Sequence, residues 1–314
     1  MPNTRIDTTL CARRLLEADD ILLLCHRDPD GDSYGSAMAL FDGLTGLGKL
    51  VRVECVSPFP PNLDYLNREM PAFSPRFVAA IDCAAPSMLG DGADRNRHID
   101  LCIDHHPTNP LFADETLLVD YAATGEAMLE VLRAMQARIT PACATALFTA
   151  LSADTGGFRY SNTSTQTLRY AADLIEAGAD FNRIRVRLFE SKSRGMILVE
   201  STALANVHYY AEGRIAVIAA PLSLMRQSCA DESELEGLAA KPLQIEGVQI
   251  GITLKEREDG YIRVSVRTSE TVDAAAICQQ FAGGGHIRAS GCRIRGSVAD
   301  AEEKLVSVAL EALS

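Results

Sequence analysis

The stretch ILLLCHRDPDGDS, residues 21–33, places an apolar segment directly before a cluster of ionisable side chains. The apolar part, residues 21–25, has the length and composition of a buried strand. The ionisable residues that follow it are His26, Asp28, Asp30 and Asp32. These groups would repel one another at a strand end unless divalent cations neutralised them, which favours a metal site. A solvated acidic loop is the alternative, because Asp, Pro and Gly are also common turn residues.

Apolar segments alternate with helix-length segments through the first half of the chain. The expected buried strands are residues 21–25, 50–56, 77–81 and 101–103. Helical periodicity covers residues 9–17, 33–47, 125–135 and 141–153, and we expect Thr124 to cap the third of these helices. This alternation predicts an α/β fold with a parallel sheet and flanking helices. Ligands of such sheets bind at the carboxyl ends of the strands.

Acidic and histidine residues also follow the third and fourth expected strands. Asp82 comes directly after the third strand, and Asp104, His105 and His106 come after the fourth. Because side chains alternate along an extended segment, we expect the two histidines to point to opposite sides, one toward a metal ion and the other toward substrate. Asp154, at the end of the fourth expected helix, fits a cap or turn aspartate and a metal ligand equally well.

The types of ligand bear on the identity of the metal. Carboxylates combined with two or three imidazoles and no thiolate favour a hard or borderline ion, Mn²⁺ or Mg²⁺, over structural zinc. Cys25 and Cys83 adjoin proposed ligands, but we expect the alternation of side chains to turn both into the core. Two ions joined by a carboxylate would suit the hydrolysis of a phosphate ester.

The second half of the chain has a different pattern. Residues 165–208 are helical in pattern, which predicts a helical connector. Alternating apolar residues between 248 and 266, interrupted by a turn signal, predict a β-hairpin. A helix is expected over residues 273–281, ahead of the glycine triplet 283–285. We therefore place a second, smaller α/β domain at about residues 213–314.

The composition excludes several classes of protein. A net charge of −12 disfavours a broad basic surface for long nucleic acid, but a small anionic substrate remains compatible with a cation-filled site. The apolar segments are too short to span a membrane, so no membrane anchor is expected. The nine cysteines contain no CxxC pair, and we expect most of them to be small buried residues of a cytoplasmic protein.

Several short motifs are distributed along nearly the whole chain. They are His26-x-Asp28-x-Asp30-Gly-Asp32-Ser33, Asp82, Asp104-His105-His106-Pro107-x-Asn109, Asp154 in Ala-Asp-Thr-Gly-Gly-Phe, and Gly283-Gly284-Gly285-His286-x-x-Ala289-Ser290-Gly291. Together they resemble the DHH/DHHA1 phosphoesterases. Within that family the length is most similar to the stand-alone nanoRNase and 3'-phosphoadenosine-5'-phosphate (PAP) phosphatase group. The resemblance implies a DHH catalytic domain at residues 1–189, a helical linker at 190–212 and a DHHA1 substrate-binding domain at 213–314.

The resemblance also implies a ligand set for two divalent ions, Mn²⁺ in the first place, with Mg²⁺ or Co²⁺ as alternatives. One ion would bind His26, Asp30 and Asp82. The other would bind Asp32, Asp82, His105 and Asp154, with Asp82 as the bridge. Asp82, His106 and Asp104 are the implied catalytic residues: His106 would face the scissile phosphate, and Asp104 would steady the histidines. Asp28 is left unassigned, with a structural role favoured over coordination.

The glycine triplet is the candidate for the substrate-binding half. Glycines before a helix start let backbone N–H groups converge on an anion, so we expect Gly283, Gly284, Gly285 and His286 to hold a terminal phosphate. Arg267, on the polar face of the predicted hairpin, would assist. A role for Arg288 in binding and a role as an ordinary surface arginine are left as alternatives.

By this resemblance the expected function is hydrolysis of short RNA or DNA oligonucleotides and dinucleotides to 5'-mononucleotides, and of PAP to AMP. Three alternatives remain: a phosphodiesterase for cyclic or linear signalling dinucleotides, an inorganic pyrophosphatase, and a non-catalytic nucleotide sensor. The oligomeric state stays open, with a homodimer as one alternative.

Overall fold

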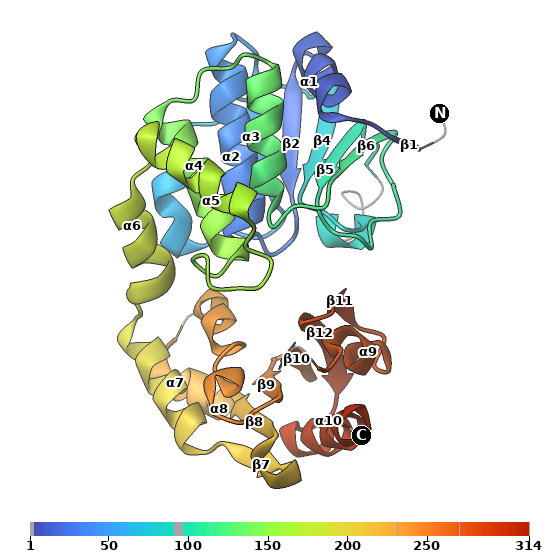
Figure 1. The fold of residues 1–314 in the computed structure, drawn as a ribbon, viewed down its shortest axis with the longest axis vertical. Coiled ribbons are helices and arrows are strands. Elements are labelled where there is room, and N and C mark those ends of the chain that lie inside the picture. Colours follow the sequence, from blue (N-terminus) through green and yellow to red (C-terminus); the bar gives the residue numbers. More distant parts are fainter. Residues whose placement is uncertain (1–2, 91–96, 231, 270, 314) are drawn as a thin grey trace. The chain divides into compact units, whose positions relative to one another are not determined.

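The chain forms two compact units, Met1–Ser191 and Lys192–Ser314 (Figure 1). The structure is a computed structural model, and it describes residues 3–90, 97–230, 232–269 and 271–313. Each unit has its own sheet and its own apolar core.

The N-terminal unit is built on a parallel six-stranded sheet in the order β1-β6-β5-β4-β2-β3. Its strands are β1 (Thr4–Arg5), β2 (Ile21–Cys25), β3 (Val51–Glu54), β4 (Phe77–Ile81), β5 (Leu101–Asp104) and β6 (Glu115–Leu118). The predicted α/β class and parallel sheet are confirmed. The strand β3 is shorter than the strand expected at residues 50–56, and the sequence pattern missed β1 and β6.

Helices cover one face of this sheet. They are α1 (Thr8–Glu17), α2 (Gly31–Gly46), α3 (Thr124–Ala134), α4 (Pro141–Asp154), α5 (Thr165–Glu176) and α6 (Phe181–Arg185). Alternate residues of β2 separate the two faces: Ile21, Leu23 and Cys25 join the large core under the helices, while Leu22 and Leu24 join a smaller core on the other face. Burial of both faces is expected for a parallel sheet.

Small residues allow α2, α3 and α4 to pack closely. A Cβ atom on Gly35 of α2 would stand 2.6 Å from the backbone oxygen of Ala146 in α4. A Cβ atom on Gly125 of α3 would stand 2.5 Å from Cβ of Ala150 in α4. Larger side chains at these glycines would force the helices apart, and the helix ends carry several of the predicted ligands.

The C-terminal unit has a mixed six-stranded sheet in the order β11-β12-β10-β9-β8-β7, in which only β8 and β9 pair in parallel. Its strands are β7 (His208–Tyr210), β8 (Ile215–Ala220), β9 (Ile250–Glu256), β10 (Tyr261–Thr268), β11 (Gly284–His286) and β12 (Ala289–Arg295). Its helices are α7 (Arg194–Ala205), α8 (Leu222–Ser228), α9 (Ala274–Gln279) and α10 (Val298–Ala312).

The predicted hairpin is confirmed as the antiparallel pair β9–β10. Two details of the sequence prediction are wrong. The helical segment 165–208 ends before His208, which lies in β7. The glycine triplet does not precede a helix start: Gly284 and Gly285 lie in β11, which pairs with β12.

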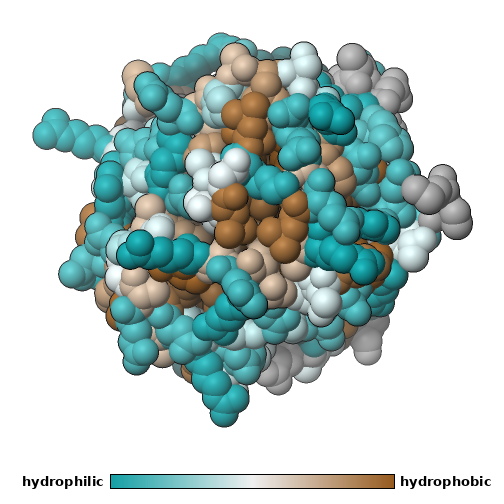
Figure 2. Space-filling model, turned by 90° about the horizontal axis from the view of Figure 1, so that it is seen from above, coloured by the Kyte–Doolittle hydropathy of each residue, from teal (hydrophilic) through white to brown (hydrophobic). Residues whose placement is uncertain are grey.

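Hydrophobic side chains also reach the surface, where they form brown groups among the hydrophilic teal ones in Figure 2. Leu16, Leu47 and Leu50 are among the exposed large hydrophobic residues. Scattered apolar side chains are normal on a protein surface and carry no functional inference. Among the helices of the described residues, none has the length and apolar character needed to span a membrane.

Candidate metal centre

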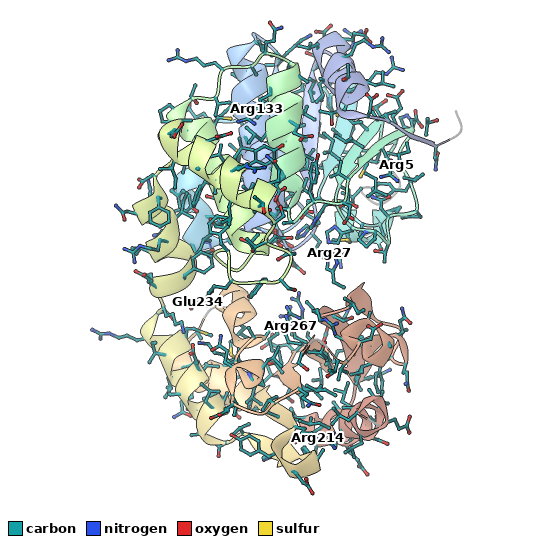
Figure 3. All side chains as sticks on the ribbon, in the orientation of Figure 1. Arg5, Arg27, Arg133, Arg214, Glu234 and Arg267 are labelled. Atoms are coloured by element: carbon teal, nitrogen blue, oxygen red, sulfur yellow. The ribbon has the colours of Figure 1, made fainter. Side chains whose placement is uncertain are left out.

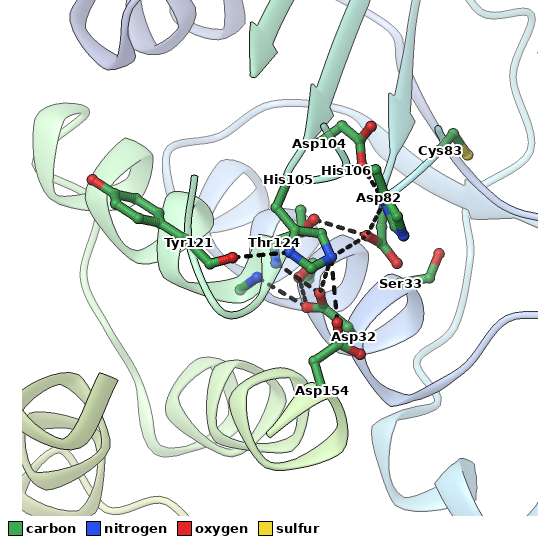
Figure 4. Close-up of polar contacts among 12 residues, drawn as sticks. Asp32, Ser33, Asp82, Cys83, Asp104, His105, His106, Tyr121, Thr124 and Asp154 are labelled. Carbon is green, nitrogen blue, oxygen red and sulfur yellow. Dashed lines mark hydrogen bonds and ion pairs between the residues drawn. The ribbon is translucent and has the colours of Figure 1, made fainter. Parts of the chain in front are cut away.

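The predicted ligands of the N-terminal unit gather where β2, β4 and β5 end. Figure 4 shows Asp32, Asp82, His105 and Asp154 of this group. His26 directly follows β2, Asp82 follows β4, and Asp104 is the last residue of β5. Parallel strands with neighbouring carboxyl ends bring these residues to one edge of the sheet. Asp154 reaches the same place from the last position of α4.

Asp82 lies at the centre of the group. Its Oδ2 atom is 3.8 Å from Nε2 of His26, and its Oδ1 atom is 3.6 Å from Nε2 of His105. The two oxygens of this carboxylate therefore face two different sets of side chains. Its backbone φ of 58° lies in the left-handed region, which is costly for most residues other than glycine. The side chain is almost fully buried.

The first set of side chains consists of His26, Asp30 and Asp82. Nε2 of His26 is 3.8 Å from Oδ1 of Asp30, and one ligand atom from each of the three residues lies within 4.8 Å of the others. Asp30 also caps α2, because its Oδ1 atom accepts the backbone N–H groups of Asp32 and Ser33 at 3.0 Å. The cap fixes where this carboxylate stands relative to the helix.

The second set consists of Asp32, Asp82, His105 and Asp154. Nε2 of His105 is 3.3 Å from Oδ2 of Asp154 and 3.9 Å from Oδ2 of Asp32. The other ring nitrogen, Nδ1, donates to the backbone carbonyl of Tyr121 at 3.1 Å. A carbonyl partner on Nδ1 fixes the ring orientation and directs Nε2 toward the carboxylates.

His106 and Asp104 form a third set beside Asp82. Nδ1 of His106 donates to Oδ1 of Asp104 at 2.7 Å and lies 3.7 Å from Oδ1 of Asp82. The side-chain amide of Asn109 donates to the other oxygen of Asp104, also at 2.7 Å. Asp104 is fully buried, so these two donors hold it in place and it in turn orients His106.

The expectation that the two histidines point to opposite sides is wrong. The His105 and His106 rings meet edge to face with centroids 4.5 Å apart, and both approach Asp82. The reason is that β5 ends at Asp104, so the alternation of an extended strand no longer applies to the following two residues. Their partners still differ, because only His106 bonds to Asp104.

The electrostatics of the site fit a bound cation. Burial and the neighbouring charge of Asp82 raise the pKa of Asp32 well above its usual range. Burial, with the charge of Asp30, raises the pKa of Asp82 to about 6. Burial alone would lower the pKa of His105, but the carboxylates around it, Asp154 first, raise it to about 11. Buried carboxylates that favour protonation and a histidine that favours the charged form both indicate a position suited to positive charge.

Sequence reasoning missed the role of Thr124. It does not cap α3: it is the first helical residue, and its N-cap Ala123 has no side-chain hydrogen bond. Instead its hydroxyl donates to Oδ1 of Asp82 at 2.8 Å, and its backbone N–H donates to Oδ2 of Asp32 at 2.7 Å. These contacts join segments far apart in sequence, so only the Thr-Gly pair at an expected helix start marked this position.

Asp28 lies apart from these sets among the described residues. Its carboxylate accepts from the hydroxyl of Ser57 at 3.4 Å. Cys25 and Cys83 are buried, as expected from the alternation of side chains, and so are Cys102 and Cys278.

The predicted substrate-binding residues belong to the C-terminal unit. A Cβ atom on Gly283 would stand 2.3 Å from the backbone oxygen of Gly291, and Gly285 has a φ of 139°, so a side chain would be costly at both positions. Gly284 has open space around it. His286 ends β11 and is exposed.

The two arginines of this predicted set contact backbone carbonyls. Arg267 of β10, labelled in Figure 3, donates to the carbonyl of Val266 at 3.1 Å. Arg288 donates to the carbonyls of Ser269 and Val272 at 2.7 and 2.5 Å, which ties two loops together.

Comparisons with known proteins match two parts of the chain to two family models. Residues 20–171 match the model of the DHH family, N-terminal domain, and residues 215–314 match that of the DHHA1 domain. The chain is similar to the bifunctional oligoribonuclease and PAP phosphatase NrnA of Thermus thermophilus, with 29% identity over 304 residues that cover 94% of this chain and 90% of the relative.

Solved structures show the same fold. An exopolyphosphatase-related protein of Bacteroides fragilis aligns with a TM-score of 0.84 at 22% identity, covering 96% of this chain and 95% of that one. RecJ of Thermus thermophilus, solved in complex with Mn²⁺, aligns with a TM-score of 0.57 at 14% identity, covering 98% of this chain and 54% of that one.

Proposed function

The chain is a DHH-family protein with a C-terminal DHHA1 domain, and from this premise we propose that it hydrolyses short oligoribonucleotides to 5'-mononucleotides and PAP to AMP. The observation that carries the proposal is the division of the Asp82 carboxylate, whose two oxygens face two separate sets of histidine and aspartate side chains. A carboxylate placed in this way is suited to bridge two divalent ions.

We propose that each of these two sets of side chains holds one ion. His26, Asp30 and Asp82 would hold one, and Asp32, Asp82, His105 and Asp154 the other. Mn²⁺ is the proposed ion, since oxygen and imidazole donors without thiolate suit it and a neighbour of the same fold is solved with it. Bound there, the ions would polarise the phosphate and lower the pKa of water.

His106 is the proposed general acid. In hydrolysis the oxygen of water forms a new bond to phosphorus, the bond to the leaving sugar oxygen breaks, and that oxygen takes up a proton. Burial would lower the pKa of His106, but Asp104 and Asp82 raise it, which favours the protonated ring. Asp104 holds Nδ1, so Nε2 would deliver the proton.

Substrate binding is proposed for the C-terminal unit. The strand β11 with Gly283, Gly284, Gly285 and His286, together with Arg267 of β10, would hold the phosphate at the far end of a short substrate. Backbone N–H groups of glycines can approach an anion closely. For Arg288 we favour a structural role over substrate binding, because its guanidinium already donates to two backbone carbonyls.

We also propose a reducing cytoplasm as the compartment, since the nine cysteines are free thiols.

Product analysis with Mn²⁺ tests the proposal. The substrates are 5'-phosphorylated dinucleotides, longer RNA, PAP, cyclic di-AMP and pyrophosphate. We expect dinucleotides and PAP to be hydrolysed fastest, with 5'-mononucleotides and AMP as products. Faster cleavage of longer RNA or of cyclic di-AMP would overturn the proposed substrate class. Hydrolysis of pyrophosphate alone would indicate a pyrophosphatase, and tight nucleotide binding without turnover would indicate a sensor.

A further inference from the structure

One short turn contacts three of the four side chains in the second proposed ligand set. It consists of residues 121–125, of which Thr124 and Gly125 are the first two residues of α3. The carbonyl of Tyr121 accepts from His105, the backbone N–H groups of Thr124 and Gly125 donate to the two oxygens of Asp32, and the Thr124 hydroxyl donates to Asp82. The three side chains come from separate parts of the chain, and five consecutive residues hold them all.

The start of α3 is suited to this task. The first N–H groups of a helix have no partner within the helix and carry partial positive charge. At α3 the N-cap residue is Ala123, which has no polar side chain to satisfy them. Asp32, from α2, supplies both acceptors instead, at 2.7 Å from the nitrogen of Thr124 and 2.9 Å from that of Gly125. Because this turn is buried, water cannot replace the carboxylate at low cost.

The Thr124 hydroxyl contacts the carboxylate that both proposed ion sites share. It donates to Oδ1 of Asp82, the oxygen nearer to His105, at 2.8 Å. A hydrogen bond to one oxygen of a carboxylate fixes rotation of the group about its terminal torsion, which is otherwise broad. Fixing this rotation also fixes the direction of Oδ2, which faces His26.

We propose that Thr124 is a positioning residue of the metal centre, which orients Asp82 through its hydroxyl and Asp32 through its backbone N–H. The proposal rests on the proposed function in taking Asp82 as the shared ligand. Partners that orient metal ligands usually contribute about 10- to 100-fold in metal affinity.

The test measures Mn²⁺ binding to the full chain by calorimetry, without substrate, after a chelator has been removed by dialysis. Thr124→Val keeps the shape and the backbone N–H but loses the hydroxyl, and Thr124→Ser keeps the hydroxyl but loses the methyl group. We expect Thr124→Val to weaken Mn²⁺ binding by about 10- to 100-fold and Thr124→Ser to bind nearly as tightly as the unchanged protein. Thr124→Val with unchanged affinity, or Thr124→Ser with an equal loss, would overturn the proposal.

A matched control accounts for lost stability. Thr149 of α4 is also buried, and its hydroxyl bonds to the carbonyl of Thr145 and to Tyr65 instead of a proposed ligand. Thr149→Val should therefore leave Mn²⁺ affinity unchanged, and an equal loss of affinity in this variant would also count against the proposal. If the unchanged protein binds Mn²⁺ but hydrolyses none of the proposed substrates, only the proposed function fails. If it binds no Mn²⁺, both fail.

Discussion

The substitution Gly35→Ala tests whether close packing of α2 on α4 maintains the metal centre. Gly35 lies in α2 three residues after Asp32, and its partner helix α4 ends at Asp154. An added Cβ atom would stand 2.6 Å from the backbone oxygen of Ala146 and 3.0 Å from the backbone nitrogen of Ala150. Neither backbone atom can rotate away as a flexible side chain would, so the two helices must separate.

Two opposing terms set the expected change in stability. Overpacking of a well-packed core costs up to about 3 kcal/mol, whereas Ala is favoured over Gly by about 1 kcal/mol in a helix interior, so the net destabilisation is about 2 kcal/mol. Gly46, at the end of the same helix, has no neighbour within 4 Å of its added Cβ atom. Gly46→Ala should therefore be neutral or stabilising by up to about 1 kcal/mol.

The assay is urea unfolding followed by circular dichroism, with Mn²⁺ calorimetry on the same samples. We expect Gly35→Ala to lower the unfolding midpoint and weaken Mn²⁺ binding, because it moves Asp32 away from Asp154. Gly46→Ala should do neither. A Gly35→Ala protein as stable as Gly46→Ala, with unchanged Mn²⁺ affinity, would refute the view that this helix contact sets the geometry of the centre.

Three further predictions concern the proposed ligands and the acid. Asp154→Asn should weaken Mn²⁺ binding by at least about tenfold, whereas Asp28→Asn should leave it unchanged; equal effects in calorimetry would remove Asp154 from the ligand set. His106→Gln should lower kcat by about 10²- to 10⁴-fold with the number of bound Mn²⁺ ions unchanged, and a loss of bound ions in metal analysis would instead make His106 a ligand. Mn²⁺ at about 100 times its Kd should stabilise the folded protein by about 2.7 kcal/mol for each bound ion, a gain that a chelator should abolish in a thermal melt.

Much of the N-terminal fold was predictable because its signals are local. The buried strands β2 and β4 and the helices that follow the 3.6-residue period have their own apolar patterns, and the proposed ligands His26 and Asp82 follow strands directly. In contrast, β1 and β6 are short: β1 pairs with β6 across more than a hundred residues, and β6 also pairs with β5. No local pattern marks a strand such as Thr4–Arg5.

The site shows the same division between local and long-range signals. The residues of the DHH motif were found because each follows an apolar segment, but the role of Thr124 depends on contacts with Asp32 and Asp82 from distant parts of the chain. The glycine triplet was predicted before a helix start because backbone N–H groups at such a place can converge on an anion. Gly284 and Gly285 form a strand instead, because β12 offers them a pairing partner, and Gly283 approaches the backbone of Gly291 closely.

In the proposed function, a metal centre joined by Asp82 hydrolyses short phosphoesters. The most direct test is product analysis on a 5'-phosphorylated adenosine dinucleotide in Mn²⁺, with the unchanged protein and Asp82→Asn side by side. We expect AMP as the product of the unchanged protein and almost none from the variant, whose amide cannot bridge two ions as a carboxylate does. Comparable AMP formation by Asp82→Asn would contradict the proposed function.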